Sequence, residues 1–448
     1  MQDRETVEKD VVSSRGKQVT ALVLLNLFLI VVSPFIFLKK LDRSLRKRVR
    51  NELDWNRWAV TDFCPEVSFR DNKSPRVVLV GAAFGELRMI EAATRLIEKE
   101  RPDASVIWCL RDVPTIRFVR KTQPGRVVVV WPFDNAFPVM KWARRVRPDV
   151  LVLVEKIWLP SLIGISRLSG SRVAVVNGRV SDKHQKSKVI KRAYDKWILD
   201  NIDVFCFQSK QLMDRLTPLL RSGTTALTTG NMKLDLETPP LDPSRVAEIE
   251  KWLATRGDIP LLIAGSTAAD GDEDFVYAAF EKVRAKVPCC LLVAPRQLSR
   301  AQETLTRAVE RGYAMSPRSA PTEQPADVYV LDTLGELAHV YQYAEGAFVG
   351  GTIHGAGHNV IEPVAWGIPV SYGPQRGNFE DLQLLCEKFG VGFRCLTPED
   401  LAAHWISVLT DAELRSKVRG QAEALLANEK GAVHKTALAI LPLIPKST

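Results

Sequence analysis

Acidic and polar residues follow several apolar runs of this 448-residue chain, at points where a buried strand would turn into a helix. The run at 77–80 is followed by the segment GAAFGE, which places Gly85 and Glu86 at the start of the next helix. A carboxylate at such a turn can accept the proton of an attacking hydroxyl group. A glutamate there also complements the helix dipole, so the spacing alone leaves a catalytic and a structural role open for Glu86.

Two later strand ends in the first half of the chain carry further polar side chains. Glu155 follows the apolar run 150–154, and Asn177 and Arg179 follow the run 173–176. Ligands of open parallel sheets bind at the carboxyl ends of the strands, so these side chains would line the same cleft as Glu86. Asn and Arg suit the recognition of hydroxyl and phosphate groups. Turn chemistry for Asn177 and an ion pair for Glu155 remain open alternatives.

Small residues and one arginine follow the strands expected in the second half. Glycine-rich turns and helix starts of this kind bind phosphate through backbone amides. Each segment alone also fits ordinary loop chemistry, but together they predict an anion site. Its residues are Ser266, Thr267, Arg296, Gly335, Glu336, Leu337, Gly350 and Gly351.

Asn359 and Glu362 stand three residues apart, which is the spacing of a capping box at a helix start. In the functional alternative, the neighbouring glycines approach a nucleotide and Glu362 binds a ribose hydroxyl group. The adjacent His358 is by itself more typical of a structural histidine.

Metal and cofactor motifs find little support in the sequence. Asp270, Asp272, Asp274 and Glu281 have the spacing of a calcium-binding loop, but Phe275 stands where that loop needs glycine. A charged loop that opens a helix is the better interpretation. The chain contains no HExxH or GxSxG motif, and its 7 cysteines form no CxxC pair. We therefore expect no metal site, no cofactor, and buried thiols in a reducing compartment.

The apolar runs themselves predict the fold. Short runs rich in Val and Ile alternate with helical patterns, as in parallel sheets that are buried on both faces. The first set lies at 77–80, 105–110, 127–131, 150–154, 173–176 and 204–207, and the second at 261–264, 290–294, 328–331, 347–349 and 370–372. We expect an α/β protein with two Rossmann-like, doubly wound domains that face a cleft. The expected boundaries are 75–236 for the first domain, 237–258 for a linker, and 259–448 for the second domain with C-terminal helices.

The N-terminal region has the features of a membrane anchor. Residues 1–50 hold eleven Lys or Arg and five Asp or Glu. Their net charge of +6 is most of the +10 of the whole chain. Residues 19–38 carry no charge and are long enough to cross a bilayer core of about 30 Å. We expect a tail at 1–18, a transmembrane helix at 19–38 and a basic juxtamembrane segment at 39–74. A cleaved signal peptide would have a shorter apolar core and a small-residue cleavage site.

The charge distribution around that segment sets the expected location and partners. Seven basic residues and one acidic residue follow it within 39–50, so the positive-inside rule puts the catalytic domains on the cytoplasmic face of the inner membrane. The same basic residues would contact anionic membrane lipids. Because the excess charge gathers around one apolar segment and not over a folded face, we expect no nucleic-acid partner.

Nine segments, in this order along the chain, resemble one known family. They are GAAFGE, RPDVLVLVE, VVNGRVS, TGNMKLD, LLVAPR, DTLGEL, FVGGT, GHNVIEP and GPQRGNFED. The family is the 3-deoxy-D-manno-octulosonic acid (Kdo) transferases, glycosyltransferase family 30. The resemblance implies the two-domain GT-B architecture, CMP-Kdo as the sugar donor and a lipid A precursor as the acceptor. It implies that Glu86 is the catalytic base of an inverting transfer that needs no metal ion.

The resemblance also implies roles for the other residues. The DTLGEL helix start, Gly350 and Gly351 would contact the nucleotide phosphate, Arg296 would take up phosphate charge, and Asn359 and Glu362 would contact the donor. Lys233 and Arg179 fall in family segments near the cleft. The segment after Glu155 departs from the family pattern, because Ile157 replaces a second acidic residue. The alternatives are another membrane-associated GT-B glycosyltransferase or a sugar-nucleotide epimerase that uses a UDP-sugar, and an inactive scaffold on the same fold.

Overall fold

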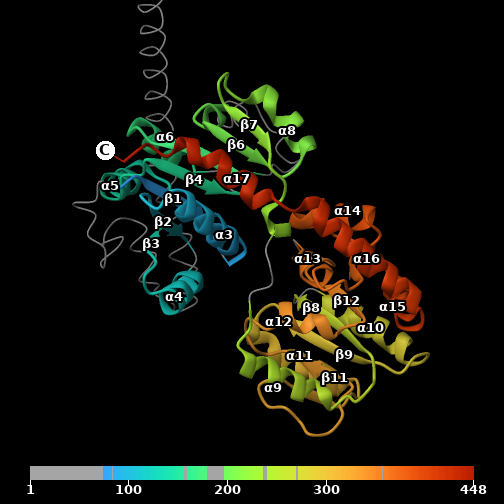
Figure 1. Cartoon of the computed structure of the whole chain (residues 1–448). Helices are drawn as coiled ribbons and strands as arrows, with labels where there is room; N and C mark the ends of the chain where they lie inside the picture. Colours follow the sequence, from blue (N-terminus) through green and yellow to red (C-terminus); the bar gives the residue numbers. More distant parts are fainter. Residues whose placement is uncertain are drawn as a thin grey trace, which may run out of the picture. The chain divides into compact units, whose positions relative to one another are not determined.

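The computed structural model of this chain describes residues 74–82, 84–111, 113–155, 159–178, 196–235, 240–268, 271–355 and 357–447. The expected N-terminal tail and transmembrane helix, and nearly all of the juxtamembrane segment, lie outside these residues. Within the described ranges, no helix combines the length and the apolar character needed to cross a membrane. The chain divides into two compact units, one of Met1–Leu236 with Gly431–Thr448 and one of Glu237–Lys430 (Figure 1).

The first unit is built on a seven-stranded sheet whose strand order is β3-β2-β1-β4-β5-β6-β7, with every pairing parallel. The strands are β1 (Arg76–Gly81), β2 (Ser105–Leu110), β3 (Val128–Val130), β4 (Val150–Val154), β5 (Arg172–Gly178), β6 (Val204–Phe207) and β7 (Thr225–Thr228). The helices are α3 (Phe84–Glu100), α4 (Val113–Thr122), α5 (Ala136–Val146), α6 (Pro160–Leu168), α8 (Lys210–Leu216), η2 (Thr217–Leu219), η3 (Met232–Asp235), α17 (Ala432–Ile440) and η7 (Leu441–Leu443).

Both faces of this sheet are buried, which explains why its central strands are continuous apolar runs. Successive side chains of a strand point to opposite faces. Val78 of β1 therefore joins the core on the side of α5 and α6, which includes Trp142. Its neighbour Val77 joins the core on the side of α3 and α17, which includes Ile90 and Val433. The outcome is a helix–sheet–helix sandwich.

The second unit has a second parallel seven-stranded sheet, in the order β10-β11-β9-β8-β12-β13-β14. The strands are β8 (Leu261–Thr267), β9 (Cys290–Pro295), β10 (Met315–Pro317), β11 (Val328–Val330), β12 (Gly346–Val349), β13 (Val370–Tyr372) and β14 (Gly392–Arg394). The helices are α9 (Pro243–Ala254), α10 (Asp272–Arg284), η4 (Leu298–Arg300), α11 (Ala301–Glu310), α12 (Leu337–Val340), η5 (Tyr341–Tyr343), α13 (Ile361–Val364), η6 (Gly377–Phe379), α14 (Glu380–Lys388), α15 (Pro398–Thr410) and α16 (Ala412–Glu429). The α/β, doubly wound class predicted from the sequence is confirmed for both units.

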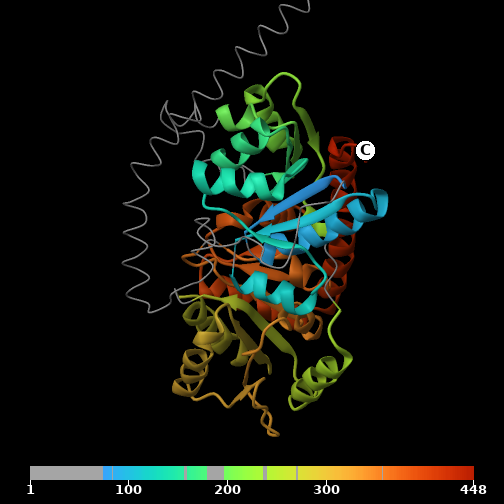
Figure 2. The same cartoon turned by 90° about the vertical axis from the view of Figure 1, so that its left-hand side faces the viewer.

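The C-terminal segment differs from the expected boundary, because it returns to the first unit. Figures 1 and 2 show the red helix α17 beside the blue helix α3. The carboxylate of Asp235 accepts hydrogen bonds from the backbone amides of Gly431 (2.8 Å) and Val433 (2.6 Å), which fixes the start of α17. Arg101, the first residue after α3, donates to the carbonyl oxygen of Ile444 at 3.0 Å. The prediction that 259–448 forms one domain is therefore wrong at its end.

The expected linker at 237–258 also differs from the structure. It contains α9, whose buried Ile249, Trp252 and Leu253 belong to a core of the second unit. The three strands that the apolar runs did not predict are β7, β10 and β14, and all three lie at sheet edges. Each of these three strands is only partly buried, so it does not need a continuous apolar sequence.

Candidate functional site

Glu86 lies in the first turn of α3, directly after the carboxyl end of β1. The residue is 8% exposed. A side-chain carbon added at Gly81 would stand 2.6 Å from the Ile90 side chain and 3.1 Å from Cβ of Glu86. Glycine at the strand end thus lets the helix start pack closely against the sheet. By contrast, a side-chain carbon at the exposed Gly85 would meet open space.

Three of the predicted side chains form a hydrogen-bonded network at the same edge of the sheet. Nδ2 of Asn177 donates to Oε1 of Glu155 at 3.0 Å, and Nζ of Lys233 lies 2.6 Å from the same oxygen. Oδ1 of Asn177 accepts the backbone amide of Met232 at 2.9 Å, which ties η3 to the end of β5. The side chains of Lys233 and Glu155 are only 13% and 8% exposed, so solvent screens this ion pair weakly. We call Glu155, Asn177 and Lys233 the edge network.

The edge network reaches the helix that carries Glu86. Nδ2 of Asn177 lies 3.1 Å from the sulfur of Met89, which stands one turn after Glu86 on α3. Glu155 and Asn177 have φ angles of 60° and 51°, which residues other than glycine rarely adopt. Backbone strain of this kind is common at functional sites, where the surrounding structure holds it in place. Arg179, the remaining residue predicted here, lies outside the described residues.

Two polar residues of this region were not predicted from the sequence. Nε2 of Gln208 donates to the carbonyl oxygen of Asn177 at 3.0 Å, and Oδ1 of Asn231 accepts the amide of Lys233 at 3.1 Å. Gln208 is the first residue after β6, so the rule that located Glu155 would also have found it. Asn231 lies in the segment TGNMKLD, and its bond to the amide two residues on is a local Asx turn, which turn chemistry could have predicted.

In the second unit, the loops after β8 and β12 are held together by one buried carboxylate. Asp272 is 1% exposed and accepts the backbone amides of Ala268 (2.8 Å), Gly351 (2.5 Å) and Ile353 (3.3 Å). A side-chain carbon at Gly350 would stand 2.6 Å from the carbonyl oxygen of Ser266. The two loops are thus in close backbone contact, and Asp272 is structural, consistent with the interpretation of its segment as a helix start.

The predicted hydroxyl residues of this edge behave differently. Ser266 is half-buried and has a φ angle of 55°, so the backbone of its loop is strained. Thr267 is fully buried, and its hydroxyl group donates to Oε1 of Glu273 at 3.0 Å. The hydroxyl group of Thr267 therefore points into the protein and not toward a ligand.

Arg296, Gly351 and His358 come together at this edge. The backbone amide of Arg296 donates to the carbonyl oxygen of Thr267 at 2.9 Å, and its side chain is exposed. Burial, with a smaller contribution from the charge of Arg296, lowers the pKa of His358 to about 4. A side-chain carbon at Gly351, whose φ is 71°, would stand 2.8 Å from Nε2 of His358. An exposed cation thus lies beside a histidine that is neutral at neutral pH.

The segment that contains Gly335, Glu336 and Leu337 leads into α12, a helical turn of four residues that begins at Leu337 and has Glu336 as its N-cap. Glu336 is 1% exposed, and its carboxylate lies 2.8 Å from Arg245 and 3.3 Å from Arg318. The side chain of Glu336 holds this turn in place, and the exposed backbone at Gly335 is the part that a ligand can reach.

Asn359 and Glu362 contact each other through their side chains at 3.3 Å. Oδ1 of Asn359 also accepts the amide of Ile361 at 3.2 Å, which satisfies a donor at the start of α13. The N-cap of α13 is Val360, without a side-chain capping bond, so the capping-box alternative for Asn359 and Glu362 is not borne out. Burial, and to a lesser extent the charge of Glu362, raises the pKa of the Tyr341 phenol. Among the residues that the structure describes, no group of His, Cys, Asp and Glu is placed to hold a metal ion.

Comparison with solved structures defines the class of fold. A glycosyltransferase from Rickettsia africae superposes with a TM-score of 0.58 at 11% sequence identity, covering 83% of this chain and 98% of that one. With its two parallel seven-stranded sheets, this chain has the two-unit α/β fold of the GT-B type.

Sequence comparisons then identify the relatives. Residues 57–236 match the model of the 3-deoxy-D-manno-octulosonic-acid transferase (kdotransferase) family. A 3-deoxy-D-manno-octulosonic acid transferase of Chlamydophila psittaci is 26% identical over 363 residues, or 80% of this chain and 82% of that protein. A bifunctional glycosyltransferase/methyltransferase of Fusobacterium nucleatum is 27% identical over 280 residues, which are 61% of this chain but only 43% of that protein. The resemblance expected from the sequence is confirmed: this chain is similar in sequence to the Kdo transferases.

Proposed function

We propose that this protein is an inverting glycosyltransferase that moves Kdo from CMP-Kdo to a hydroxyl group of a lipid A precursor, lipid IVA. The observation that carries the proposal is the buried Glu86 after the end of β1, on the same helix as Met89, which contacts the edge network. It lies within residues 57–236, the region that matches the Kdo-transferase family model. The relatives named Kdo transferases supply the substrate class.

The reaction proceeds in one displacement. Glu86 accepts the proton of the acceptor hydroxyl group, and the oxygen forms a bond to the anomeric carbon of Kdo. The bond between that carbon and the phosphate oxygen breaks, and CMP leaves with the electron pair. Attack from the face opposite the leaving group inverts the anomeric configuration. In this mechanism the edge network orients the acceptor, and Lys233 contributes a nearby positive charge.

The second unit binds the donor in this proposal. Arg296 is an exposed cation beside the loop of Gly351, and guanidinium groups bind phosphate through paired hydrogen bonds. The backbone at Ser266, Gly335 and Gly350 approaches the nucleotide closely because these positions carry small side chains. Asn359 and Glu362 contact the sugar or ribose hydroxyl groups. No step of this mechanism requires a metal ion.

We further propose that residues 19–38 hold the enzyme in the inner membrane, with both units on the cytoplasmic face. The apolar segment and the basic residues after it support this location. A lipid acceptor stays in the membrane, so an anchored transferase meets it at a high local concentration.

The test is transfer by the full chain in nanodiscs, with CMP-Kdo generated in situ and lipid IVA as acceptor, read by mass spectrometry. We expect a mass gain of one or more Kdo units that persists in EDTA and is lost in Glu86→Ala. Binding of CMP and UDP is measured in parallel. Preference for UDP and no Kdo transfer would overturn the proposal in favour of another nucleotide sugar. CMP binding without Kdo transfer would retain the donor assignment and contradict lipid IVA as the acceptor.

A further inference from the structure

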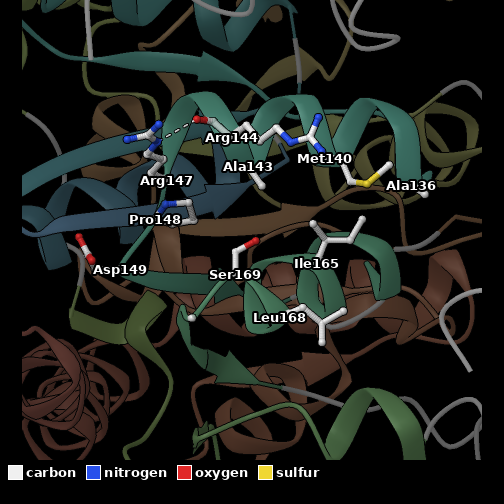
Figure 3. Close-up of a pocket in the computed structure, with 11 residues that line it drawn as sticks. Ala136, Met140, Ala143, Arg144, Arg147, Pro148, Asp149, Ile165, Leu168 and Ser169 are labelled. Carbon is white, nitrogen blue, oxygen red and sulfur yellow. Dashed lines mark hydrogen bonds between the residues drawn. The ribbon is translucent and has the colours of Figure 1, made fainter. Parts of the chain in front are cut away.

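A groove on the first unit lies between α5 and α6 and has a volume of about 720 Å³ (Figure 3). Its rim includes Arg147, Pro148 and Asp149, which precede β4, and Ser169 and Gly170, which precede β5. The groove therefore extends to the amino edge of the sheet, whereas Glu86 and the edge network follow the carboxyl ends of the strands. It is separate from the candidate functional site.

The side walls of the groove are largely apolar. Figure 3 shows Met140 and Ala143 of α5 across from Ile165 and Leu168 of α6. Met140 is 39% exposed and Leu168 is 40% exposed, although both are large hydrophobic side chains. Phe137, on the turn of α5 before Met140, is 66% exposed. Large apolar side chains that gather at one exposed place mark binding surfaces more often than scattered ones do.

The α5 side of the groove carries two cations: the Arg144 side chain runs toward Met140, and Arg147 lies at the C-terminal end of the helix (Figure 3). Arg144 and Arg147 are exposed and stand one turn apart, and Nε of Arg147 donates to the carbonyl oxygen of Arg144 at 3.1 Å. Among the described residues, neither guanidinium group forms an ion pair with a carboxylate. Asp149 is the one acidic residue of the lining, and its Oδ2 already accepts the backbone amide of Arg76 at 2.7 Å. Helix α5 itself carries no acidic residue.

We propose that this groove binds one anionic amphiphile, with its alkyl chain along Met140, Ile165 and Leu168 and its phosphate or carboxylate head on the α5 side, which Arg144 and Arg147 line. An apolar trench bordered by two exposed arginines complements a molecule that presents one alkyl chain and one negative head. Arginine holds phosphate and carboxylate through paired hydrogen bonds. The volume is within the usual range of small-molecule sites. The proposal does not depend on the sugar transfer proposed above.

The experiment uses the full chain with Cys64→Ser, in nanodiscs of neutral phosphatidylcholine. A fluorophore is attached at Phe137→Cys, beside the groove but outside its lining. The described native cysteines are buried, so they do not compete for the label. Decyl phosphate, decyl maltoside and inorganic phosphate are titrated separately. Decyl maltoside shares only the alkyl chain with decyl phosphate, and inorganic phosphate shares only its head. We expect a saturable emission shift with decyl phosphate at a concentration at least about tenfold lower than with either partial ligand.

Variants assign the binding to the groove. The double variant Arg144→Gln/Arg147→Gln is expected to raise the half-saturating concentration of decyl phosphate about tenfold, and Leu168→Gln to weaken both decyl ligands. The matched control is Arg120→Gln on α4, an exposed arginine on the opposite face of the sheet. All four substituted residues are exposed, and an unchanged thermal midpoint shows that each variant folds. Equal binding by the double variant and by Arg120→Gln overturns the proposal.

The source of the amphiphile is tested in discs that contain anionic phosphatidylglycerol and no added ligand. A shift of the label there that the double variant abolishes identifies a bilayer lipid as the occupant. If decyl phosphate binds but these discs give no shift, the groove takes a soluble amphiphile. Equal affinity for decyl phosphate and decyl maltoside in the unmodified groove removes the anionic head from the proposal and overturns it.

Discussion

The carboxyl edges of the two sheets use their buried charges in different ways. In the first unit, Nζ of Lys233 and Oε1 of Glu155 form an ion pair at 2.6 Å, and Asn177 connects this pair to the helix that carries Glu86. In the second unit, the Asp272 carboxylate accepts hydrogen bonds from three backbone amides, and the Glu336 carboxylate forms ion pairs with two arginines. One edge therefore presents buried side chains that bind one another, and the other presents backbone that buried side chains have fixed.

This difference predicts what each edge tolerates. Where side chains do the chemistry, removing one functional atom should abolish activity with little change in fold. Where buried carboxylates shape the backbone, a change of size should alter ligand affinity and stability together. Substitutions at the two edges test that division, and the largest effect is expected at Glu86.

Glu86→Gln removes the proton acceptor and keeps the size of the side chain. We expect kcat for Kdo transfer to fall by about 10²–10⁴-fold, the usual contribution of a general base. The thermal midpoint and CMP binding should not change. Glu100→Gln, at the exposed last turn of the same helix, is the matched control and should retain full activity. Transfer by Glu86→Gln at more than a tenth of the normal rate would exclude this residue as the base.

Lys233→Met breaks the ion pair of the edge network and leaves Glu155 without its cation. Because both side chains are largely buried, we expect a loss of about 2–4 kcal/mol in the free energy of unfolding of the first unit. Lys210→Met breaks the pair with Asp214, whose side chains are 75% and 56% exposed, and should cost less than about 1 kcal/mol. Urea denaturation followed by tryptophan fluorescence measures both.

The double variant Glu155→Gln/Lys233→Met separates the ion pair from simple packing. It removes both charges, so part of the lost stability should return while transfer stays impaired. If the double variant is as unstable as the sum of its single variants, the two charges do not interact and the edge network is not a coupled unit.

The fold could be predicted where burial dictates the sequence. The central strands, such as β4 and β9, are apolar runs because helices cover both faces of each sheet. The apolar pattern of α17 predicts a helix but does not tell which sheet it covers. Its place on the first unit depends on Asp235, which lies 196 residues before Gly431 in sequence. Sequence spacing contains no signal for that contact.

The candidate site shows the same limit. The positions of Glu86 and Glu155 could be predicted, because ligand-binding groups of parallel sheets follow strand ends and that rule needs only the strand positions. The structural roles of Thr267 and Glu336 could not be predicted, because their partners come from other elements. Arg245, for example, precedes Glu336 by 91 residues. The direction of a buried side chain is decided by tertiary packing.

Gly350→Ala tests whether the second edge is built from backbone. The added carbon would stand 2.6 Å from the carbonyl oxygen of Ser266 and 2.8 Å from the carboxylate of Asp272. We expect the β8 and β12 loops to separate, with a loss of about 1–3 kcal/mol in unfolding free energy. KM for CMP-Kdo should rise more than kcat falls. Gly125→Ala, where the added carbon meets no atom within 4 Å, should leave both unchanged.

The smallest expected effect is a pH dependence of the second unit that arises from His358. Burial lowers the pKa of this imidazole from 6.5 to about 4, so the unfolded chain binds a proton at a higher pH than the folded chain. The resulting stability is fully present above pH 6.5 and is lost as the pH falls toward 4. We expect the substitution His358→Gln to reduce the loss of unfolding free energy between pH 7 and pH 5 by about 1 kcal/mol, since partial exposure weakens the effect.

His404 of α15, whose pKa burial also lowers to about 4, should contribute a loss of the same sign. Denaturation midpoints of the two single variants, measured from pH 7 to pH 5, check this. If His358→Gln keeps the full slope while His404→Gln flattens it, the imidazole beside Gly351 is open to solvent. The backbone of the second edge would then be less tightly covered than its buried carboxylates indicate.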